Sequence, residues 1–460
     1  MLNPHIFRAY DIRGIADPVD GKAVDLTAET AYLIGRGVGT YLVRKYGVNS
    51  MAVGRDNRLT GPMLQEAYVR GILECGISVF DIGIATSPML YFSVCAFNFD
   101  SGTAITASHN PKEYNGFKVV SSGAHSVCGD EFKLIYDLIE KGDFAVTEKP
   151  GQLHEQEVWG KYLVELASRV SLKRKLKVVV DCGNATPGKF APELFRHIGC
   201  DVIELHCELD GNFPNHEANP EELHNMLDLI EAVKDHHADI GIGFDGDGDR
   251  VGVVDEKGQH YSADYLLLLL ARELAGRCAG QPVVFDVKVS QVIINEMAAL
   301  GLVPVMSKTG HSFIEAKMKE LNAPLGGEVS GHMFFGEDYY GFDDAFLAAV
   351  KILQILAAET HPLSQMFNSL PKVYNTPEIK FPCADDKKFI LVGALVAHFT
   401  KLYPCITIDG VRVNFTDSAW GAVRASNTSP NLTLRFEAES SERLEEIQRE
   451  MMGAIEELGN

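Results

Sequence analysis

The sequence has no long hydrophobic run. Its longest strongly apolar stretch, Tyr265–Ala271, is far shorter than the roughly 20 residues that a helix needs to cross a bilayer. Residues 1–8 also lack the apolar core of a signal peptide. We therefore expect neither a membrane partner nor export of the chain.

Cysteine offers no disulfide framework. The nine cysteines are scattered along the chain, no C-x-x-C pair occurs, and an odd number argues against complete pairing. This pattern is typical of a reduced, cytoplasmic protein.

Positive charge is scarce. The chain has 42 Lys and Arg residues against 63 Asp and Glu residues, which gives a formal net charge of −21. Such a charge opposes non-specific binding to nucleic acid and to anionic membranes, so neither is expected as a partner. An anionic substrate would have to be held by arginine and lysine side chains that gather locally.

The remaining composition is that of a soluble folded protein. Hydrophobic residues make up 46% and charged residues 23% of the chain, and both values are ordinary. At 460 residues the chain exceeds what one hydrophobic core usually supports, so we expect several domains.

Runs typical of strands alternate with runs typical of helices through the first two thirds of the chain. Helical patterns occupy Thr60–Cys75 and Ser262–Arg277. The strand-like runs are Met51–Gly54, Ile77–Ile82, Ala104–Thr106, Lys177–Asp181, Val202–Leu205, Asp239–Phe244, Pro282–Val287 and Val303–Met306. This alternation predicts an α/β architecture with largely parallel sheets.

The end of the chain follows another pattern. Ile406–Phe415 reads as a hairpin with Asp409-Gly410 at its turn, and Asn431–Glu439 reads as a further strand. A last helix carries one apolar face, formed by Leu444, Ile447, Met451, Ile455 and Leu458. We predict a separate α+β domain that starts near Pro371.

A candidate hydroxyl nucleophile lies on a predicted tight turn. Residues 106–111 read T-A-S-H-N-P and follow the strand-like run Gly102–Thr106, which places Ser108 at the end of a strand. A lone serine in a loop is most often a turn residue or a helix cap. However, ligands of open α/β sheets bind at the carboxyl ends of strands.

Three aspartates occur together after the apolar run that ends at Phe244. The glycines between them allow the backbone to curl, so that Asp245, Asp247 and Asp249 can face one point. Three carboxylates at one point repel unless a divalent cation lies among them, and Mg²⁺ is the usual cation where phosphate is handled.

A solvated acidic turn would be the simpler interpretation of these aspartates. The preceding apolar run and the following Arg250 argue against it, because an arginine beside the carboxylates can stabilise a transferring phosphoryl group. A metal site combined with the Ser108 hydroxyl predicts phosphoryl transfer through the serine.

The same aspartates also resemble part of an EF-hand. They occupy positions one, three and five of such a loop, and Glu256 falls at position twelve. Position six requires glycine for its sharp turn, but Arg250 stands there. The flanks read as strands rather than helices, so a calcium sensor is not expected.

Two other kinds of site, a P-loop and the nucleophile turn of an α/β-hydrolase, are not supported by the sequence. Residues 183–189 match most of a P-loop, but Phe190 stands where Ser or Thr would ligate Mg²⁺. A strand-to-helix turn is the better interpretation. No G-x-S-x-G motif occurs, which argues against an α/β-hydrolase.

Several of these segments, in their order along the chain, resemble the α-D-phosphohexomutase family and within it the bacterial phosphomannomutase/phosphoglucomutase branch. The resemblance covers nearly the whole chain. It is carried by F-R-A-Y-D-I-R-G at 7–14, T-A-S-H-N-P-K-E-Y-N-G-F-K at 106–118, D-G-D-G-D-R at 245–250, G-E-V-S-G-H at 327–332 and R-A-S-N-T-S-P at 424–430.

The resemblance implies a fold of three related α/β domains, with mixed and largely parallel sheets, plus a smaller C-terminal α+β domain around a central cleft. The expected domains are 1–150 with a phosphoserine loop, 151–255 with a metal-binding loop, 256–370 with a sugar-recognition loop and 371–460 with a phosphate-binding loop.

The resemblance also implies catalytic roles. Ser108 would carry a phosphoryl group and complete the metal ligands that Asp245, Asp247 and Asp249 supply. The other implied catalytic residues are Arg250 and His109, which directly follows the serine. Lys118 and His332 are the candidate general acids or bases.

Substrate recognition is implied for further segments. Glu328 and Ser330 would bind the 3- and 4-hydroxyls of the sugar, so glucose and mannose would both be accepted and a C4 epimer rejected. The remaining residues implied in substrate binding are Tyr10, Arg13, Lys288, His311, Val329, Gly331, His332 and, for the non-reacting phosphate, Arg424, Ala425, Ser426, Asn427 and Thr428. The family often carries an arginine after the position of Lys288, where this chain has Val289-Ser290-Gln291.

The predicted activity is the reversible conversion of hexose 6-phosphate to hexose 1-phosphate. It would use one Mg²⁺ per chain and glucose or mannose 1,6-bisphosphate as intermediate and activator. The expected partner is a phosphosugar, and a monomer is favoured. Alternatives are a phosphoglucosamine mutase of the same family, and a non-catalytic protein that binds sugar phosphates or calcium.

Overall fold

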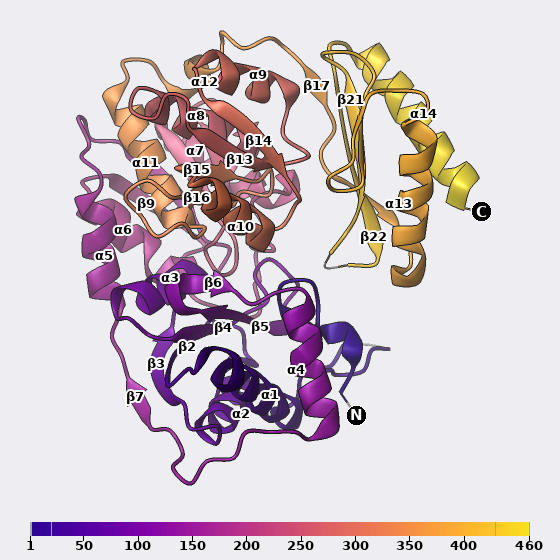
Figure 1. Ribbon diagram of the computed structural model, residues 1–460. Helices are drawn as coiled ribbons and strands as arrows, with labels where there is room; N and C mark the ends of the chain where they lie inside the picture. Colours follow the sequence, from indigo (N-terminus) through magenta and orange to yellow (C-terminus); the bar gives the residue numbers. More distant parts are fainter. Residues whose placement is uncertain (1, 20, 428, 460) are drawn as a thin grey trace. The chain divides into compact units, whose positions relative to one another are not determined.

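The computed structural model describes residues 2–19, 21–427 and 429–459 (Figure 1). Internal contacts divide the chain into two compact units. The first unit contains Met1–Leu266 and Ser330–Met366, and the second contains Leu267–Val329 and Phe367–Asn460. The four-domain bounds expected from the sequence stay a prediction.

The first sheet of the first unit has the strand order β1-β5-β4-β2-β3-β7, with β6 paired to β5. Strands β2, β3, β4 and β7 are parallel, whereas β5 runs antiparallel to β1, β4 and β6. Their bounds are β1 Ile12–Ile15, β2 Ser50–Arg55, β3 Ser78–Ile84, β4 Ser101–Ile105, β5 Tyr114–Ser121, β6 His125–Ser126 and β7 Leu153–Glu155. Its helices are α1 Ala28–Tyr46, α2 Gly61–Leu73, α3 Ser87–Ala96 and α4 Asp130–Lys141.

Helices α1 and α2 pack closely because glycines face each backbone. A Cβ on Gly35 would lie 2.3 Å from the carbonyl oxygen of Tyr68, and one on Gly71 would lie 2.5 Å from that of Tyr32. Only hydrogen at these positions permits the observed approach.

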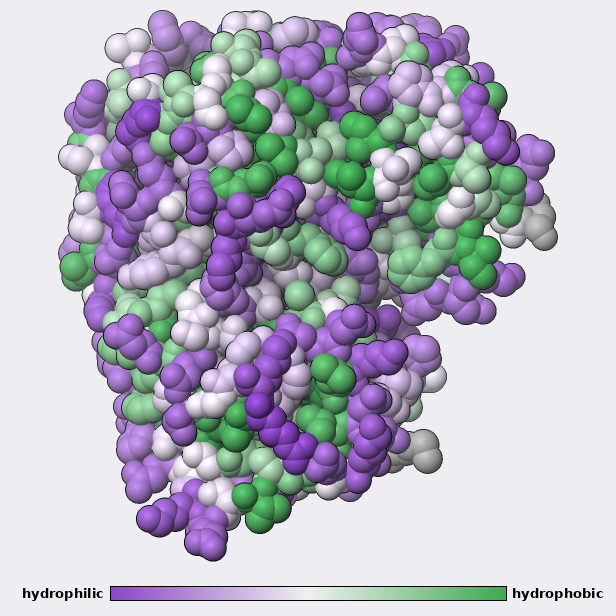
Figure 2. Space-filling model, viewed as in Figure 1, coloured by the Kyte–Doolittle hydropathy of each residue, from purple (hydrophilic) through white to green (hydrophobic). Residues whose placement is uncertain are grey.

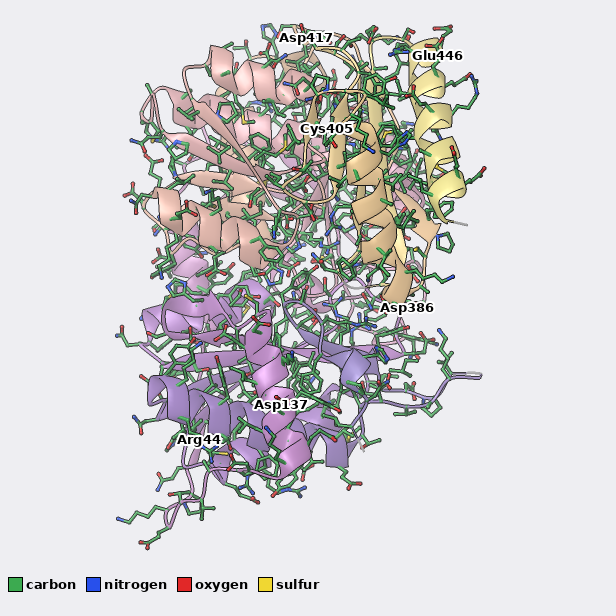
Figure 3. The ribbon with its side chains drawn as sticks, turned by 45° about the vertical axis from the view of Figure 1, so that its right-hand side comes forward. Arg44, Asp137, Asp386, Cys405, Asp417 and Glu446 are labelled. Atoms are coloured by element: carbon green, nitrogen blue, oxygen red, sulfur yellow. The ribbon has the colours of Figure 1, made fainter. Side chains whose placement is uncertain are left out.

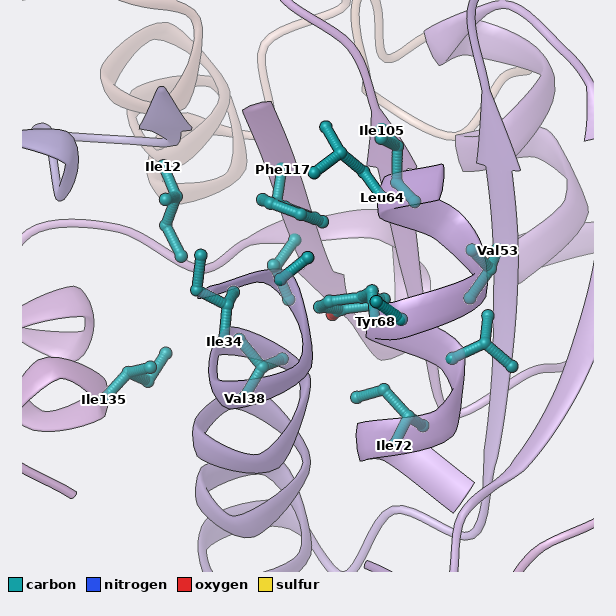
Figure 4. Close-up of a cluster of buried hydrophobic side chains, with 14 of the residues drawn as sticks. Ile12, Ile34, Val38, Val53, Leu64, Tyr68, Ile72, Ile105, Phe117 and Ile135 are labelled. Carbon is teal, nitrogen blue, oxygen red and sulfur yellow. The ribbon is translucent and has the colours of Figure 1, made fainter. Parts of the chain in front are cut away.

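The core of this sheet is built from side chains of α1, α2 and the strands (Figure 4). Tyr68 stacks on Phe117 with ring centroids 4.9 Å apart, and its hydroxyl lies 2.8 Å from Thr103 Oγ1. Ile34 and Val38 of α1 are fully buried in the same cluster. Burial of these apolar groups fixes the strands whose ends carry the candidate site.

The second sheet has the order β12-β11-β10-β8-β9. Strands β8, β9 and β10 are parallel, and β11 returns antiparallel to β10. The bounds are β8 Lys177–Asp181, β9 Asp201–Leu205, β10 Ile240–Phe244, β11 Val251–Asp255 and β12 His260–Tyr261, with helices α5 Trp159–Ser168, α6 Ala191–His197 and α7 Leu227–Asp235.

The rest of the first unit comprises β16 Met333–Phe335, α11 Ala345–Ala358 and α12 Leu363–Met366. Helix α11 begins at an Asp344 cap, whose side chain accepts from the Leu347 amide. It is apolar on nearly all sides and buried accordingly. Helix α8, Ala263–Ala275, begins in the first unit and continues in the second.

The second unit contains the parallel strands β14, β13 and β15 and an antiparallel sheet in the order β17-β22-β21-β20-β19, with β18 on β22. Helices α13 and α14 cover one face of the antiparallel sheet (Figure 1). The bounds are β13 Pro282–Asp286, α9 Gln291–Ala299, β14 Val303–Ser307, α10 His311–Leu321, β15 Leu325–Gly327, β17 Tyr374–Asn375, β18 Ile379–Pro382, α13 Asp385–Phe399, β19 Cys405–Ile406, β20 Val411–Asn414, β21 Trp420–Ala425, β22 Asn431–Ala438 and α14 Ser441–Gly459.

The predicted architecture is confirmed: mixed α/β sheets precede an α+β C-terminal segment. The hairpin expected at Asp409-Gly410 forms, with Ile406 opposite Arg412 and Gly410 at φ +74°. On α14, Met451 is buried as predicted, but Leu458 is 38% exposed because it lies at the end of the helix.

On the face drawn in Figure 2, hydrophilic residues occur throughout and hydrophobic residues gather in small groups. Figure 3 shows charged side chains around the helices, including the exposed Asp386 of α13 and Glu446 of α14. The nine cysteines are free. Within the described ranges, every helix is too short or too polar to span a bilayer.

Candidate active site

Ser108 lies directly beyond β4, in the loop that leads into β5. It is 3% exposed, and its backbone adopts a left-handed conformation with φ +51°. For a residue other than glycine this conformation costs of order 1–3 kcal/mol, so the surrounding contacts must maintain it. The Ser108 hydroxyl donates to Asp245 Oδ2 at 2.6 Å and lies 3.1 Å from His109 Nδ1.

The aspartate loop joins β10 to β11. Asp245, Asp247 and Asp249 are buried, and one oxygen of each lies within 4.8 Å of the others. Gly248, at φ +73°, allows the tight curl that was expected from the sequence. A Cβ on Gly246 would lie 2.2 Å from the Ser108 carbonyl oxygen, so the serine and aspartate loops touch through their backbones.

The donor set of this loop suits a hard divalent cation. Oδ1 of Asp247 and Oδ1 of Asp249 are buried and have no hydrogen-bond partner among the described residues. Asp245 Oδ1 instead accepts from the backbone amides of Asp249 and Arg250, each at 3.1 Å. Buried carboxylate oxygens without partners are costly, and oxygen ligands in this number are those that Mg²⁺ binds.

The carboxylates of the loop repel one another. Burial and the charges of Asp249 and Asp247 raise the pKa of Asp245 well above its ordinary value. A cation bound among the three would reverse this effect, because it stabilises the ionised forms.

Lys118 on β5 neutralises part of this charge. Its Nζ lies 2.8 Å from Asp247 Oδ2 and 2.5 Å from Asp249 Oδ2. Burial acts to lower the pKa of Lys118, but the carboxylates of Asp247 and Asp249 raise it well above its ordinary value. Lys118 is therefore held as a charged ammonium beside the Ser108 loop, and in this form it has no free electron pair with which to act as a base.

Arg250 and His332 face each other across an isolated β-bridge. Arg250 Nε donates to His332 Nε2 at 3.0 Å, and His332 Nδ1 lies 2.7 Å from Asp343 Oδ2. These contacts require the tautomer with the proton on Nδ1. His332 Nδ1 is also 3.7 Å from Asp249 Oδ1, so His332 adjoins the aspartate loop.

Two first-unit residues were missed at the sequence level in this region. Asp343 orients the His332 ring. Asp249, His332 and Asp343 form a second group that could hold a metal ion. Ser87, at the start of α3, donates to Asp247 Oδ2 at 2.7 Å and fixes that carboxylate. Neither lies in a motif that marks it beforehand.

The opening motif also reaches the serine loop. Arg13 on β1 donates to Asn110 Oδ1 at 2.9 Å and pairs with Asp11 at 2.6 Å. Tyr10, in the same motif, is half-buried. The first unit thus brings together the predicted residues of the serine loop, the aspartate loop and the N-terminal motif.

In the second unit, Lys288 follows β13 and is 4% exposed. Its Nζ forms an ion pair with Glu378 at 2.5 Å. Burial opposes ionisation, but Lys288 lowers the pKa of Glu378 below its ordinary value. Since Lys288 is already paired, binding a phosphate would require the ammonium to be shared or exchanged.

The segment in which this chain departs from the family pattern is held by Arg412. Its guanidinium donates to the carbonyl oxygens of Val287 and Val289 at 2.7 and 2.8 Å. The Gln291 amide donates to Glu437 at 2.9 Å. These contacts fix the segment Val289-Ser290-Gln291, where the resemblance implies an arginine that this chain lacks.

Asp286, at the end of β13, joins two predicted recognition loops and was missed at the sequence level. One of its oxygens accepts from the Lys288 amide at 2.7 Å, and the other accepts from the Val329 amide at 3.1 Å. Glu328 is buried and accepts from the Gly310 amide at 2.6 Å, next to His311 at the start of α10. Both loops are therefore preorganised within the second unit.

The other residues of this loop belong to the first unit. Ser330 is half-buried, and Gly331 has φ +105°, while its carbonyl accepts from the Val251 amide at 3.2 Å.

The predicted phosphate loop, residues 424–430, begins with the last two residues of β21. Arg424 Nε donates to Asp409 Oδ2 at 2.7 Å, and the side-chain amide of Asn427 donates to the Thr309 carbonyl at 3.3 Å. Ala425 is buried at the end of β21. Thr428 lies outside the described residues.

Lys388 of α13 contacts the phosphate loop, and no motif in the sequence marked this residue. It is 3% exposed, and its Nζ donates to the carbonyls of Ser426 and Ser429 at 2.6 and 3.1 Å. Ser426 Oγ also lies 2.8 Å from Ser429 Oγ. Lys388 also pairs with Asp385 Oδ1 at 2.6 Å, so it fixes the shape of the loop from behind, and the binding of a phosphate by this loop stays a prediction.

Four successive segments match the four domains described for phosphoglucomutase/phosphomannomutase. Residues 4–146, 159–258 and 262–374 match alpha/beta/alpha domains I, II and III, and residues 378–454 match the C-terminal domain. The chain belongs to the phosphoglucomutase/phosphomannomutase family. Its resemblance to the phosphohexomutases is thereby confirmed.

Relatives within the family are similar over nearly their full lengths. The phosphomannomutase/phosphoglucomutase of Pseudomonas aeruginosa is 43% identical over 97% of this chain and 94% of that protein. The phosphoglucomutase of Neisseria gonorrhoeae is 41% identical over 98% and 96%. A crystal structure of a phosphoglucomutase/phosphomannomutase family protein from Burkholderia thailandensis has a TM-score of 0.91 and 37% identity, and the match covers 100% of this chain and 98% of that one.

Proposed function

We propose that this chain is a phosphoglucomutase/phosphomannomutase that interconverts hexose 6-phosphates and hexose 1-phosphates. The observation that carries the proposal is the contact between Ser108 Oγ and Asp245 Oδ2 at 2.6 Å, beside buried oxygens of Asp247 and Asp249 that accept no hydrogen bond from the described residues. A hydroxyl nucleophile thus meets a cation-binding loop. The 41–43% identity to proteins of these names supports the substrate class.

Phosphorylated Ser108 would donate its phosphoryl group to the free hydroxyl of the substrate. The bond from phosphorus to Ser108 Oγ breaks, a bond from phosphorus to the sugar oxygen forms, and the sugar hydroxyl proton passes to a base. The resulting 1,6-bisphosphate then turns end over end and returns its other phosphoryl group to Ser108. A supplied bisphosphate would therefore act as the activator.

The groups around Ser108 suit these steps. Asp245, Asp247 and Asp249 would hold one Mg²⁺, which stabilises the charge that develops on the phosphoryl oxygens. Arg250 would add a guanidinium to the same charge. Lys118 and His332 are the candidates for moving the proton, and His109 lies within reach of the serine hydroxyl.

Recognition of the sugar is proposed for the second-unit loops and for Ser330. Glu328 and Ser330 would bind the 3- and 4-hydroxyls, which have the same orientation in glucose and mannose. Tyr10, Arg13, Lys288 and His311 would line the site, and the remaining contacts would come from Val329, Gly331, Arg424, Ala425, Ser426 and Asn427. A cytoplasmic location is proposed from the free cysteines, and the monomeric state stays a prediction.

The substrate class is tested by following phosphate position with ³¹P NMR. With a trace of glucose 1,6-bisphosphate, we expect conversion of glucose 1-phosphate and mannose 1-phosphate. A C4 epimer, galactose 1-phosphate, should react at least about a hundredfold more slowly, because buried polar groups would lose their partners. Faster turnover of glucosamine 6-phosphate would favour the amino-sugar mutase, and no turnover of any sugar phosphate would favour a binding protein.

A further inference from the structure

Arg58 lies behind the serine loop and has no role in the mechanism so far described. It follows β2 and is 1% exposed. Its guanidinium donates to four backbone carbonyls of the serine loop at 2.6–3.0 Å, those of Ser108, Asn110, Pro111 and Tyr114. Its Nε donates to Asp56 Oδ2 at 3.0 Å. All five guanidinium hydrogens are thus accounted for.

Asp56 extends this network to the other side of Ser108. Asp56 Oδ2 accepts from the Thr106 hydroxyl at 2.7 Å. Thr106 Oγ1 in turn accepts from the Ser108 amide at 2.9 Å. Arg58 thus binds the carbonyl of Ser108 directly, and Asp56 acts on its amide through Thr106.

These contacts coincide with the strained backbone of Ser108. Its φ of +51° is unfavourable for a residue with a side chain. The Ser108 carbonyl, which accepts from Arg58 at 2.8 Å, is the atom that a Cβ on Gly246 would strike. A shift of this carbonyl would therefore alter both the serine loop and its contact with the aspartate loop.

We infer that Arg58 is a positioning residue for phosphoryl transfer. With Asp56 and Thr106, it maintains the left-handed backbone that directs Ser108 Oγ to Asp245. This inference rests on the proposed function, in which Ser108 carries the phosphoryl group. In-line transfer depends on placement of the nucleophile, and a displacement of about 1 Å can cost about a hundredfold in rate.

The geometry requires arginine rather than a positive charge alone. Four carbonyls in different directions need a planar, forked donor, whereas the lysine ammonium is a compact point charge with three donors. Phe213 also covers the guanidinium, with Cζ 5.3 Å from the ring centroid, which favours a flat cation.

The test compares Arg58→Lys with Arg36→Lys. Arg36 is a matched control, because it is an arginine of the same sheet domain that donates to a backbone carbonyl, that of Ala145, at 3.1 Å. For Arg58→Lys we expect kcat to fall at least about tenfold, with KM for glucose 1-phosphate within about threefold of the wild-type value. Arg36→Lys should keep kcat within about twofold. A folded Arg58→Lys enzyme with wild-type kcat would overturn the inference.

A second pair of variants keeps the test decisive if Arg58→Lys does not fold. Thr106→Val removes the acceptor for the Ser108 amide, and Thr106→Ser retains it. We expect Thr106→Val to lose kcat at least about tenfold and Thr106→Ser to keep most of it, with both variants folded at the assay temperature by circular dichroism. Equal kcat values for Val and Ser at this position would refute the positioning role.

Failure of the inference and failure of the proposed function give different results. If Ser108 is not the phosphoryl carrier, the wild-type chain shows no phosphate on Ser108 after incubation with the bisphosphate. If Arg58 does not position the loop, wild-type Ser108 is phosphorylated and Arg58→Lys turns over normally.

Discussion

Ser108→Ala is expected to abolish mutase activity while the fold persists. The substitution removes the only oxygen that forms the covalent intermediate in the proposed reaction, so turnover should fall by about a thousandfold or more. The lost contacts are those to Asp245 and His109, and both are polar contacts at a loop. Turnover of glucose 1-phosphate, followed together with circular dichroism, measures both outcomes.

The matched control is Ser122→Ala, which makes the same chemical change at an exposed position of the same sheet domain. This variant should keep wild-type turnover. Wild-type kcat in Ser108→Ala would refute the phosphoserine mechanism, and loss of activity in both variants would point to a general effect on the domain.

Removal of divalent cations should silence the enzyme, and Mg²⁺ should restore it. Burial and the neighbouring carboxylates raise the pKa of Asp245, and a cation bound among these oxygens would relieve their repulsion. Mg²⁺ should also raise the Tm of the wild-type chain, because it binds the folded state alone. Activity after chelation and the Mg²⁺ dependence of Tm provide two independent measurements.

Asp247→Asn tests where the cation binds. Asp247 Oδ1 is a buried oxygen without a partner among the described residues, and replacing this carboxylate should raise the Mg²⁺ concentration for half-maximal activity at least about tenfold. Asp137→Asn, on the outer helix α4 (Figure 3), should leave that concentration unchanged. Activity that withstands chelation, or the same Mg²⁺ dependence of Tm in Asp247→Asn as in the wild-type chain, would contradict the aspartate site.

The strands could be predicted because a buried strand has a local run of hydrophobic, β-branched residues. Lys177–Asp181 was expected as a strand and forms β8 with the same bounds. Buried parallel strands read as continuous runs of β-branched residues, and four of the five residues of β8 are buried. The hairpin at Asp409-Gly410 was predictable for a similar reason, because Gly410 at φ +74° supplies the turn that such a pair signals.

The contacts that hold the site were not predictable in this way. Arg58 reaches carbonyls about fifty residues further along the chain, and Asp343 reaches His332 from beyond a strand. Neither contact produces a periodicity or a motif. The available signal was weaker: charged residues that directly follow a buried strand, such as Asp56 and Arg58 after β2, lie where ligands and loops meet.

The aspartate loop could be predicted from the sequence because its three carboxylates lie within five consecutive residues. Three aspartates separated by glycines must curl together, and the structure brings their oxygens within 4.8 Å of one another. The approach of Ser108 to Asp245 depends instead on the packing of two separate sheets. Sequence reasoning reached it from the places of Ser108 and Asp245 directly after predicted strands, and from the family resemblance.

The central claim is that Ser108 carries the transferred phosphoryl group, and intact-mass spectrometry tests it most directly. The purified wild-type chain is incubated with glucose 1,6-bisphosphate and its intact mass is measured. Proteolysis then locates the modified residue. We expect a single phosphate-sized adduct within residues 106–111, absent from Ser108→Ala. An active wild-type chain with Ser108 unmodified, or with its phosphate on another residue, would contradict the claim.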